Sequence, residues 1–262
     1  MMPKVLDLDL DFFVYPVVRG SVKARPRPSH VDNPCASVDQ VREYLERKCG
    51  LSRTKKLPGR FCKKHDGAFY AWKKWLAKGT LDKPFEVAHL DGHSDLSFGD
   101  DSSAYILETT LALPLHQRSG PPRKRNCMGE GSYLTFAVAN RWIEHLSYVY
   151  PVCEWSDYER QSNEAFNVIP RDLSCVLFKD QNPESGAIQL RHLDKRGYMN
   201  AVGGGSVTPI AVEPEVPFTW TPANKFSHEG FTHMILAHSE KYCPLEADDL
   251  ILVITEYFYD AY

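Results

Sequence analysis

Three carboxylates stand at alternate positions near the start of the sequence. The segment VLDLDLDFF, residues 5–13, carries Asp7, Asp9 and Asp11. Successive side chains of a β-strand point to opposite faces, so a strand here would place all three carboxylates on one face. The apolar flanking residues indicate that this strand is buried, and buried charges are normally paired or bound to a metal ion. The segment therefore predicts a cation site, with an edge strand bearing a solvated acidic face as the alternative.

A second segment repeats this spacing with an imidazole included. HLDGHSDL, residues 89–96, overlaps the end of an apolar strand predicted at residues 85–91, and it carries Asp91, His93 and Asp95. Mixed carboxylate and imidazole ligands suit a borderline divalent ion such as manganese, iron or zinc better than calcium. Together the two segments predict a metal site at strand ends, and clustering without a metal is the alternative.

His65 is a candidate for a further ligand because of its place in the chain. RFCKKH at residues 60–65 is predicted to be a short strand, and Asp66 is predicted to cap a helix that runs to about Lys78. His65 would then project from a strand end, where the other candidate ligands also lie. A lone histidine is more often structural, but a site with two ions needs a second imidazole, so we predict that His65 is a ligand.

The remaining pattern predicts the elements that position these residues. Ser37 is expected to cap a helix that ends near Cys49, and further helices are expected at residues 106–114 and 132–146. Short apolar strands are expected at residues 146–152, 173–179, 231–238 and 248–258. Strands interleaved with helices predict a single α/β domain over residues 1–262, with a mainly parallel sheet covered by helices on both faces. Ligands of such sheets gather at the carboxyl ends of the strands.

Composition limits the class of protein. The 262 residues are 43% hydrophobic and 25% charged, which is ordinary for a soluble globular chain. The formal net charge of −3 gives no reason to expect a nucleic-acid partner, and no apolar stretch approaches the ~18 residues that span a bilayer. The N-terminus resembles no secretory signal, and the seven cysteines form no CxxC motif. We expect a cytoplasmic protein without a membrane partner, and the sequence predicts no oligomeric state.

The segments DLDLDFF and HLDGHSDL resemble the metal-binding segments of the ureohydrolase (arginase/deacetylase) superfamily. Together with KKHDGAFYAW, GSYLTFAVANRW and LAHSEKYCP, they resemble the branch that contains peptide arginases, which convert arginine residues of ribosomally made peptides to ornithine. This resemblance implies a three-layer sandwich, a pair of Mn²⁺ ions (with Fe²⁺ or Zn²⁺ as alternatives) and an arginine-containing peptide as substrate. Two departures stand out. The DxD segment comes first here, which implies a permuted strand order, and KKHD at residues 63–66 must replace the absent GGDHS motif.

The resemblance also implies a role for each ligand. Two carboxylates would bridge the ions, a histidine and an aspartate would complete each ion, and one aspartate would lie deeper as a hydrogen-bond acceptor. In that order these residues are Asp91 and Asp9, then His65 with Asp95 and His93 with Asp11, and finally Asp7. A shifted register, with Asp7 and Asp9 as the ligands, is the alternative.

Hydrolysis of a guanidinium group needs a strong nucleophile, and two divalent ions about 3.5 Å apart lower the pKa of a shared water. Glu256, expected at the end of a strand, is the candidate carboxylate for gripping the guanidinium group, with a solvated glutamate as the alternative. His116 is the candidate proton shuttle, with His228 and His233 as alternatives. Two other functions stay open: a metal-dependent amide hydrolase or deacetylase on the same fold, and a non-catalytic domain with a structural ion.

Overall fold

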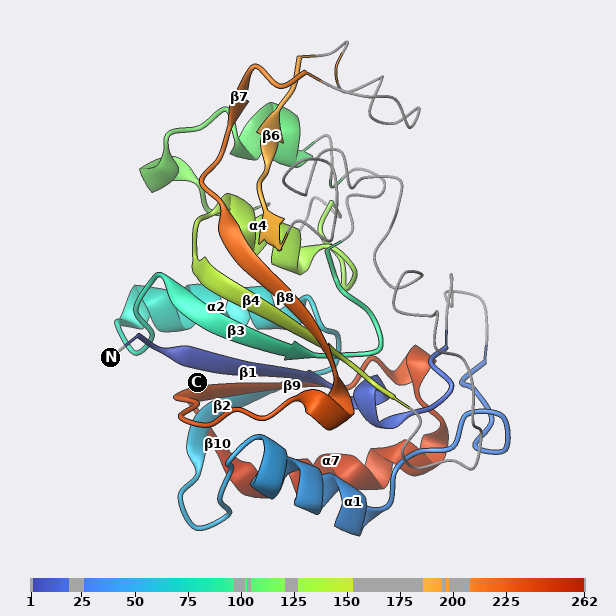
Figure 1. Cartoon of the computed structure of the whole chain (residues 1–262). Helices are drawn as coiled ribbons and strands as arrows, with labels where there is room; N and C mark the ends of the chain where they lie inside the picture. Colours follow the sequence, from blue (N-terminus) through green and yellow to red (C-terminus); the bar gives the residue numbers. More distant parts are fainter. Residues whose placement is uncertain are drawn as a thin grey trace.

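An eight-stranded sheet runs through the centre of the computed structural model (Figure 1). The structure describes residues 2–18, 26–96, 102, 105–120, 127–152, 186–194, 197 and 208–261. The strand order is β10-β2-β9-β1-β3-β4-β8-β5, and every neighbouring pair is parallel except β5 with β8. The prediction of a mainly parallel sheet is therefore confirmed. The strands are β1 Lys4–Asp9, β2 Leu57–Cys62, β3 Phe85–Leu90, β4 Ile143–Tyr150, β5 Ala187–Ile188, β8 Val216–Pro222, β9 His233–Ala237 and β10 Phe258–Asp260, with β6 Arg191–His192 and β7 Ala211–Val212 forming a separate pair.

Helices lie against both faces of this sheet. One layer contains α2 (Gly67–Lys78) and α4 (Tyr133–Ala139), and the other contains α1 (Val38–Glu43) and α7 (Asp248–Ile254) (Figure 1). Shorter helical turns connect these elements: Leu10–Phe13, Tyr44–Lys48, Ile106–Thr110, Leu115–Gln117, Ala223–Lys225, Glu240–Tyr242, Leu245–Ala247 and Thr255–Tyr257. No helix in the described part of the chain combines the length and apolarity needed to cross a membrane.

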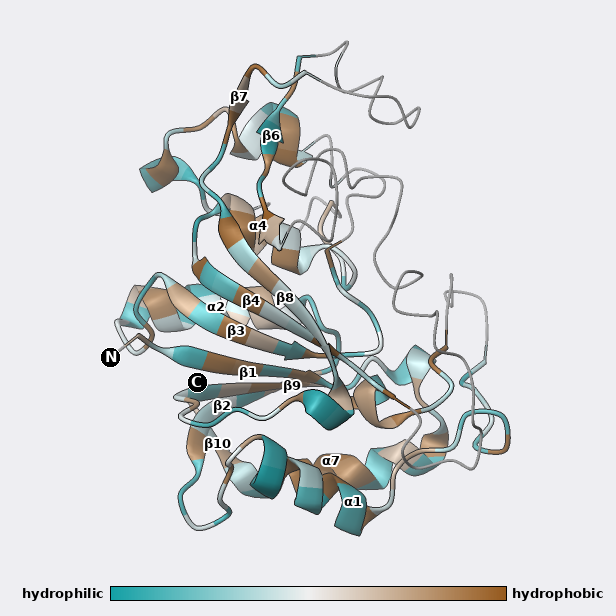
Figure 2. Ribbon diagram, in the orientation of Figure 1, coloured by the Kyte–Doolittle hydropathy of each residue, from teal (hydrophilic) through white to brown (hydrophobic). Residues whose placement is uncertain are grey.

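The alternation of side chains along β1 divides the core into two parts. Val5 packs in the cluster with Trp72 of α2, whereas Leu6 and Leu8 pack in the cluster with Leu250 of α7. In Figure 2 the central strands and α1 carry both hydrophilic and hydrophobic colours. Because residues two apart share a face, Asp7 points to the same side of the sheet as Val5, toward α2 and α4. The polar site is therefore built on the α2/α4 side.

Helix starts are predicted better than helix ends. Ser37 caps α1 through a reciprocal pair of hydrogen bonds with Gln40, and α2 ends at Lys78 as expected. The helix predicted at residues 132–146 is wrong beyond Ala139, because Arg141 takes a left-handed backbone conformation (φ 54°) that ends the helix before β4 begins. The helix expected at residues 106–114 is confined to a π-helical turn at Ile106–Thr110.

The strand predicted at residues 248–258 is wrong, because this segment forms α7 and a following helical turn. Leu250, Val253 and Ile254 stand at helical spacing and are buried against the sheet, whereas Leu252 is 73% exposed. A short continuous apolar run fits a buried strand and a buried helix equally well. The strand predicted at residues 173–179 lies outside the described residues.

Candidate metal centre

The carboxyl ends of four neighbouring strands, β2, β9, β1 and β3, meet at one edge of the sheet. Parallel register sets Leu8 of β1 beside Leu90 of β3, so the next residues on each strand, Asp9 and Asp91, emerge together. His65 follows three residues after β2, and Ser239 follows two residues after β9. The topology thus gathers polar side chains from distant parts of the sequence at the edge where parallel sheets bind ligands.

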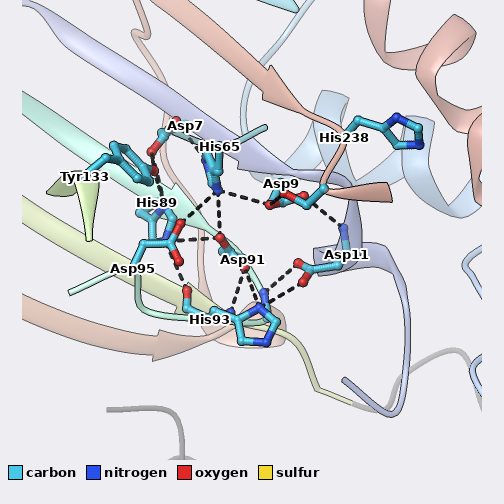
Figure 3. A network of polar contacts seen from close by, with 12 residues as sticks. Asp7, Asp9, Asp11, His65, His89, Asp91, His93, Asp95, Tyr133 and His238 are labelled. Carbon is cyan, nitrogen blue, oxygen red and sulfur yellow. Dashed lines mark hydrogen bonds and ion pairs between the residues drawn. The ribbon is translucent and has the colours of Figure 1, made fainter. Parts of the chain in front are cut away.

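The first group of atoms surrounds the imidazole of His65. Its Nδ1 lies 2.9 Å from Oδ2 of Asp91 and 3.1 Å from Oδ2 of both Asp9 and Asp95 (Figure 3). These atoms are close, yet Nδ1 of His65 and Oδ2 of Asp95 have no hydrogen-bond partner within the described residues. The oxygens and the nitrogen converge on a common point without the geometry of hydrogen bonds.

The second group surrounds His93. Its Nδ1 lies 3.0 Å from Oδ2 of Asp11 and 3.5 Å from Oδ1 of Asp91. Oδ2 of Asp11 is also buried without a hydrogen-bond partner among the residues that the structure describes. Asp91 therefore gives one carboxylate oxygen to each group, which is the geometry of a carboxylate that joins two sites.

These side chains fit a divalent cation. Among the described residues, atoms of Asp9, His65 and Asp91 lie within 4.8 Å of one another, and so do atoms of Asp11, Asp91 and His93. Buried polar atoms without partners cost free energy, and a cation between them would satisfy the orphaned oxygen and nitrogen atoms. Imidazole nitrogen with carboxylate oxygen is the donor set of manganese, iron and zinc sites. All six predicted ligands come together here.

Asp7 lies behind these groups and holds two imidazoles. Its carboxylate is 3.2 Å from Nε2 of His65 and 3.1 Å from Nδ1 of His89, and it accepts a hydrogen bond from the Tyr133 hydroxyl. With its Nε2 turned to Asp7, His65 presents Nδ1 to the carboxylates on its other side, as metal-bound histidines do. Burial alone would raise the pKa of Asp7, but the neighbouring His65 and His89 lower it. The expected role of Asp7 as the deeper acceptor matches this arrangement.

Two residues of the network were not predicted. His89 stands between Asp7 and Asp91, with Nε2 at 3.0 Å from the His93 carbonyl oxygen and 3.4 Å from Oδ2 of Asp91. Its two-residue step before Asp91 continues the alternating pattern and is a signal that the sequence contained. Tyr133 comes from the start of α4, 126 residues from Asp7, and no local spacing indicates that contact.

The carboxylates repel one another in the absence of a cation. Burial, followed by the charges of Asp11 and Asp91, raises the pKa of Asp9 to about 6. Burial and Asp91 also raise the pKa of Asp11. Burial opposes protonation of His93, yet Asp11 and Asp91 raise its pKa well above the usual value. The site is therefore an electrostatic environment that favours uptake of positive charge, either protons or metal ions.

The backbone around the candidate metal centre also adopts special conformations. Gly92 donates its N–H to Oδ1 of Asp11 at 3.0 Å, and a Cβ at this position would lie 2.7 Å from a methyl carbon of Val17. Asp95 and Ser239 adopt left-handed conformations (φ 48° and 43°), which cost free energy for residues with a side chain. Both residues contact the cluster: Ser239 donates a hydrogen bond to Oδ2 of Asp9, and Oδ2 of Asp95 lies 3.1 Å from Nδ1 of His65.

The two predicted catalytic residues do not reach the cluster. Glu256 pairs with Arg42 at 3.1 Å in the helical turn just before β10, and this places it at the amino edge of the parallel sheet. Its expected position at the end of a strand is wrong, because α7 replaces that strand. His116 is exposed in the turn before Arg118, and Arg118 donates to the carbonyl of Ala139 at the far end of α4 from Tyr133.

The alternative histidines are placed elsewhere too. His233 is the first residue of β9, and His228 contacts Nζ of Lys4 at 3.1 Å, so both lie at the amino edge. His238, which the sequence did not indicate as a shuttle, follows β9, but in Figure 3 its ring points away from the cluster, and Nε2 lies 2.8 Å from Oδ1 of Asp248. His116, His228 and His233 therefore lie too far from the cluster to act as its proton shuttle.

The chain matches no model of a known protein family and no curated protein in the searches made.

Proposed function

We propose that this chain is a manganese-dependent hydrolase that cleaves the guanidinium group of arginine residues in a peptide. The products are ornithine and urea: the water oxygen joins the guanidinium carbon, the bond from that carbon to the side-chain nitrogen breaks, and the released amine takes up a proton. The observation that carries the proposal is the pair of groups that share Asp91, one around the buried His65 and the other around the partly exposed His93.

The donor set supports a pair of ions at these groups. Asp9, Asp95 and His65 would hold one ion, Asp11 and His93 would hold the other, and Asp91 would contribute to both. When bound, divalent ions at such a pair of sites supply a water of lowered pKa that acts as a nucleophile at neutral pH. Fe²⁺ and Zn²⁺ would accept the same ligands.

Hydrogen bonds within the chain orient the candidate ligands. Asp7 orients His65 and His89 by accepting from their rings, and Tyr133 fixes Asp7 in turn. Ser239 and the backbone N–H of Asp11 hold the Asp9 carboxylate in place. A cluster oriented by such partners keeps its ligand atoms in position before any ion binds.

Urea release tests the proposal directly. The protein is loaded with Mn²⁺, its metal content is measured, and an arginine-containing peptide is followed by mass spectrometry for loss of urea. We expect about two ions per chain, urea from the peptide, weaker activity on free arginine, and loss of activity in Asp91→Asn. One zinc ion per chain with release of acetate from an acetyl-lysine peptide would contradict the arginine assignment and favour an amide hydrolase.

A further inference from the structure

An acidic residue lies in the turn that leads into α4. The backbone of this turn is fixed, because Gly129 N–H donates to Oγ of Ser132 at 3.1 Å and Ser132 N–H donates to the Gly129 carbonyl at 3.1 Å. Glu130 lies within the turn, and Tyr133, three residues later, reaches Asp7 inside the cluster. The turn therefore holds Glu130 at a defined place near the metal centre.

The carboxylate of Glu130 has a weak partner. Its side chain is 28% exposed, and within the described residues its ion-pair partner is Lys64, at 3.5 Å between Nζ and Oε1. Lys64 immediately precedes His65 and is itself 75% exposed. An exposed lysine on a long flexible stem contributes little free energy to such a pair. Lys64 is thus a counter-ion that another cation can displace.

The charges of the cluster influence the pKa of Glu130. Burial raises its pKa, Lys64 lowers it, and the charges of Asp9 and Asp95 raise it further. Tyr242 lies beside the same cluster, with its ring centroid 4.7 Å from that of His93. The side chain of His93 is 29% exposed, whereas that of His65 is 1% exposed. Its ion-pair partner Lys64 directly precedes His65, and Tyr133, three residues after Glu130, enters the cluster, so Glu130 lies beside the cluster without belonging to either group of candidate ligands.

We propose that Glu130 binds the guanidinium group of the substrate, which displaces Lys64 from the carboxylate. The inference rests on the proposed function, since it takes arginine as the reacting residue. A planar guanidinium can donate two parallel hydrogen bonds to a carboxylate, whereas an ammonium group acts as a point charge. The exchange therefore favours arginine over a lysine ammonium group.

Binding of matched peptides tests the role of Glu130. The probes are acetyl-Ala-Arg-Ala-amide and its citrulline analogue, which is neutral and nearly isosteric with arginine. On manganese-loaded protein, affinity is taken from KM for the arginine peptide and from the inhibition constant of the citrulline peptide where urea is released, and from calorimetry where it is not; metal content is measured in parallel. We expect the wild-type protein to prefer the arginine peptide by roughly 10- to 100-fold, the range for a charge-assisted hydrogen-bonded pair. Glu130→Gln should lose this preference while its metal content stays unchanged.

A matched control is available at the opposite edge of the sheet. Glu86 pairs with Lys4 at 3.5 Å, and its side chain is 30% exposed, which matches the distance and the exposure of Glu130 in its pair with Lys64, although Lys4 is the more buried lysine at 26% against 75%. Glu86→Gln removes a similar ion pair and should keep the preference for arginine. Lys64→Met removes the competing cation and should tighten binding of the arginine peptide a few-fold.

The outcomes separate this inference from the proposed hydrolysis. A preference for arginine that survives in Glu130→Gln, or a wild-type protein with no preference, overturns the role of Glu130. Urea release with an unchanged KM in Glu130→Gln overturns it too, while leaving the hydrolase intact. Preferential binding without urea release overturns the hydrolase alone. If Glu130→Gln does not fold, Lys64→Met decides, because unchanged affinity in that variant contradicts displacement of Lys64.

Discussion

Removing one charge from the metal centre should stabilise the metal-free protein. Asp9 is 3% exposed, and its carboxylate oxygen lies within 4.8 Å of one from Asp91. Asp9→Asn keeps the shape of the side chain, retains an oxygen that accepts from the N–H of Asp11, and places an NH₂ group that can donate to Ser239. The substitution therefore removes repulsion and leaves the local hydrogen bonds in place.

The size of the effect follows from the structure in two ways. Two like charges at 4.8 Å, the upper limit of this separation, repel by about 3.5 kcal/mol at an effective dielectric constant of about 20. The pKa of Asp9, which includes this repulsion together with burial and the charge of Asp11, rises from 3.8 to about 6, and this corresponds to a penalty of about 3 kcal/mol on the ionised form. After the cost of burying an amide, Asp9→Asn should raise the free energy of unfolding by about 1–3 kcal/mol in chelator at pH 7.5.

Bound Mn²⁺ should make the wild type more stable than Asp9→Asn, the reverse of the order expected without metal. At a free Mn²⁺ concentration 100 times Kd, each bound ion adds about 2.7 kcal/mol to the wild-type free energy of unfolding. Asp9→Asn loses a ligand from the group around His65 and should gain less. Urea denaturation of both proteins, with EDTA and with Mn²⁺, measures these changes. We expect the variant to be the more stable protein in EDTA and the less stable one in Mn²⁺.

The pH dependence in EDTA has a defined sign. The folded protein holds the Asp9 proton more tightly than the unfolded chain, so wild-type stability falls as pH rises from about 4 to about 6. The advantage of Asp9→Asn should grow through this window and stay constant above it. A variant less stable than the wild type in EDTA at pH 7.5, or one whose gain from Mn²⁺ equals that of the wild type, would refute the reasoning.

Three further changes have distinct expected results. Asp7→Asn should destabilise the protein by about 2–4 kcal/mol in EDTA as well as in Mn²⁺, because it removes the countercharge of His65 and His89; equal stability in urea denaturation would contradict this. Gly92→Ala should weaken Mn²⁺ binding about 10-fold in a metal titration, because its Cβ would approach Val17, and unchanged affinity would show that the loop can yield. Glu213→Gln should lower the free energy of unfolding by about 2–3 kcal/mol at pH 7 without loss of metal. Burial opposes ionisation of Glu213, but hydrogen bonds from arginine and histidine side chains lower its pKa to about 2, so the deficit should shrink as pH falls from 4.5 toward 2, and a constant deficit would count against it.

The alternating spacing in the sequence predicted several of the side chains that meet at the cluster. Asp9, Asp91 and Asp95 follow from two-residue steps at strand ends, and His65 follows from its place between a strand and a helix start. Asp11 reaches the cluster by a different route, because β1 stops at Asp9 and residues 10–13 turn into a 3-10 helix. The Asp9 side chain accepts from the N–H of Asp11, a local bond that competes with continued strand pairing.

Residues that depend on long-range packing could not be predicted in this way. Tyr133 meets Asp7 only because α4 lies on the same face of the sheet as α2. Glu256 was assigned to a strand end because the segment before it is apolar at nearly every position, and such a run does not reveal whether it is a strand or a helix. Glu130 lies in a turn without any spacing that relates it to the metal segments, and its place becomes evident from the fold alone.

The three aspartates of the first segment differ in role because they differ in depth along the strand. Asp7 lies beside His89 within the paired part of β1, and its two carboxylate oxygens contact the imidazoles of His65 and His89 and orient them. Asp9 is the last residue of the strand and Asp11 lies beyond it, so both can turn toward the carboxyl edge, where β3 delivers Asp91. A row of like charges on one strand is thus tolerable because the sheet separates them into one structural countercharge and two candidate ligands. The two groups also differ in exposure, because the side chain of His93 is 29% exposed whereas that of His65 is 1% exposed.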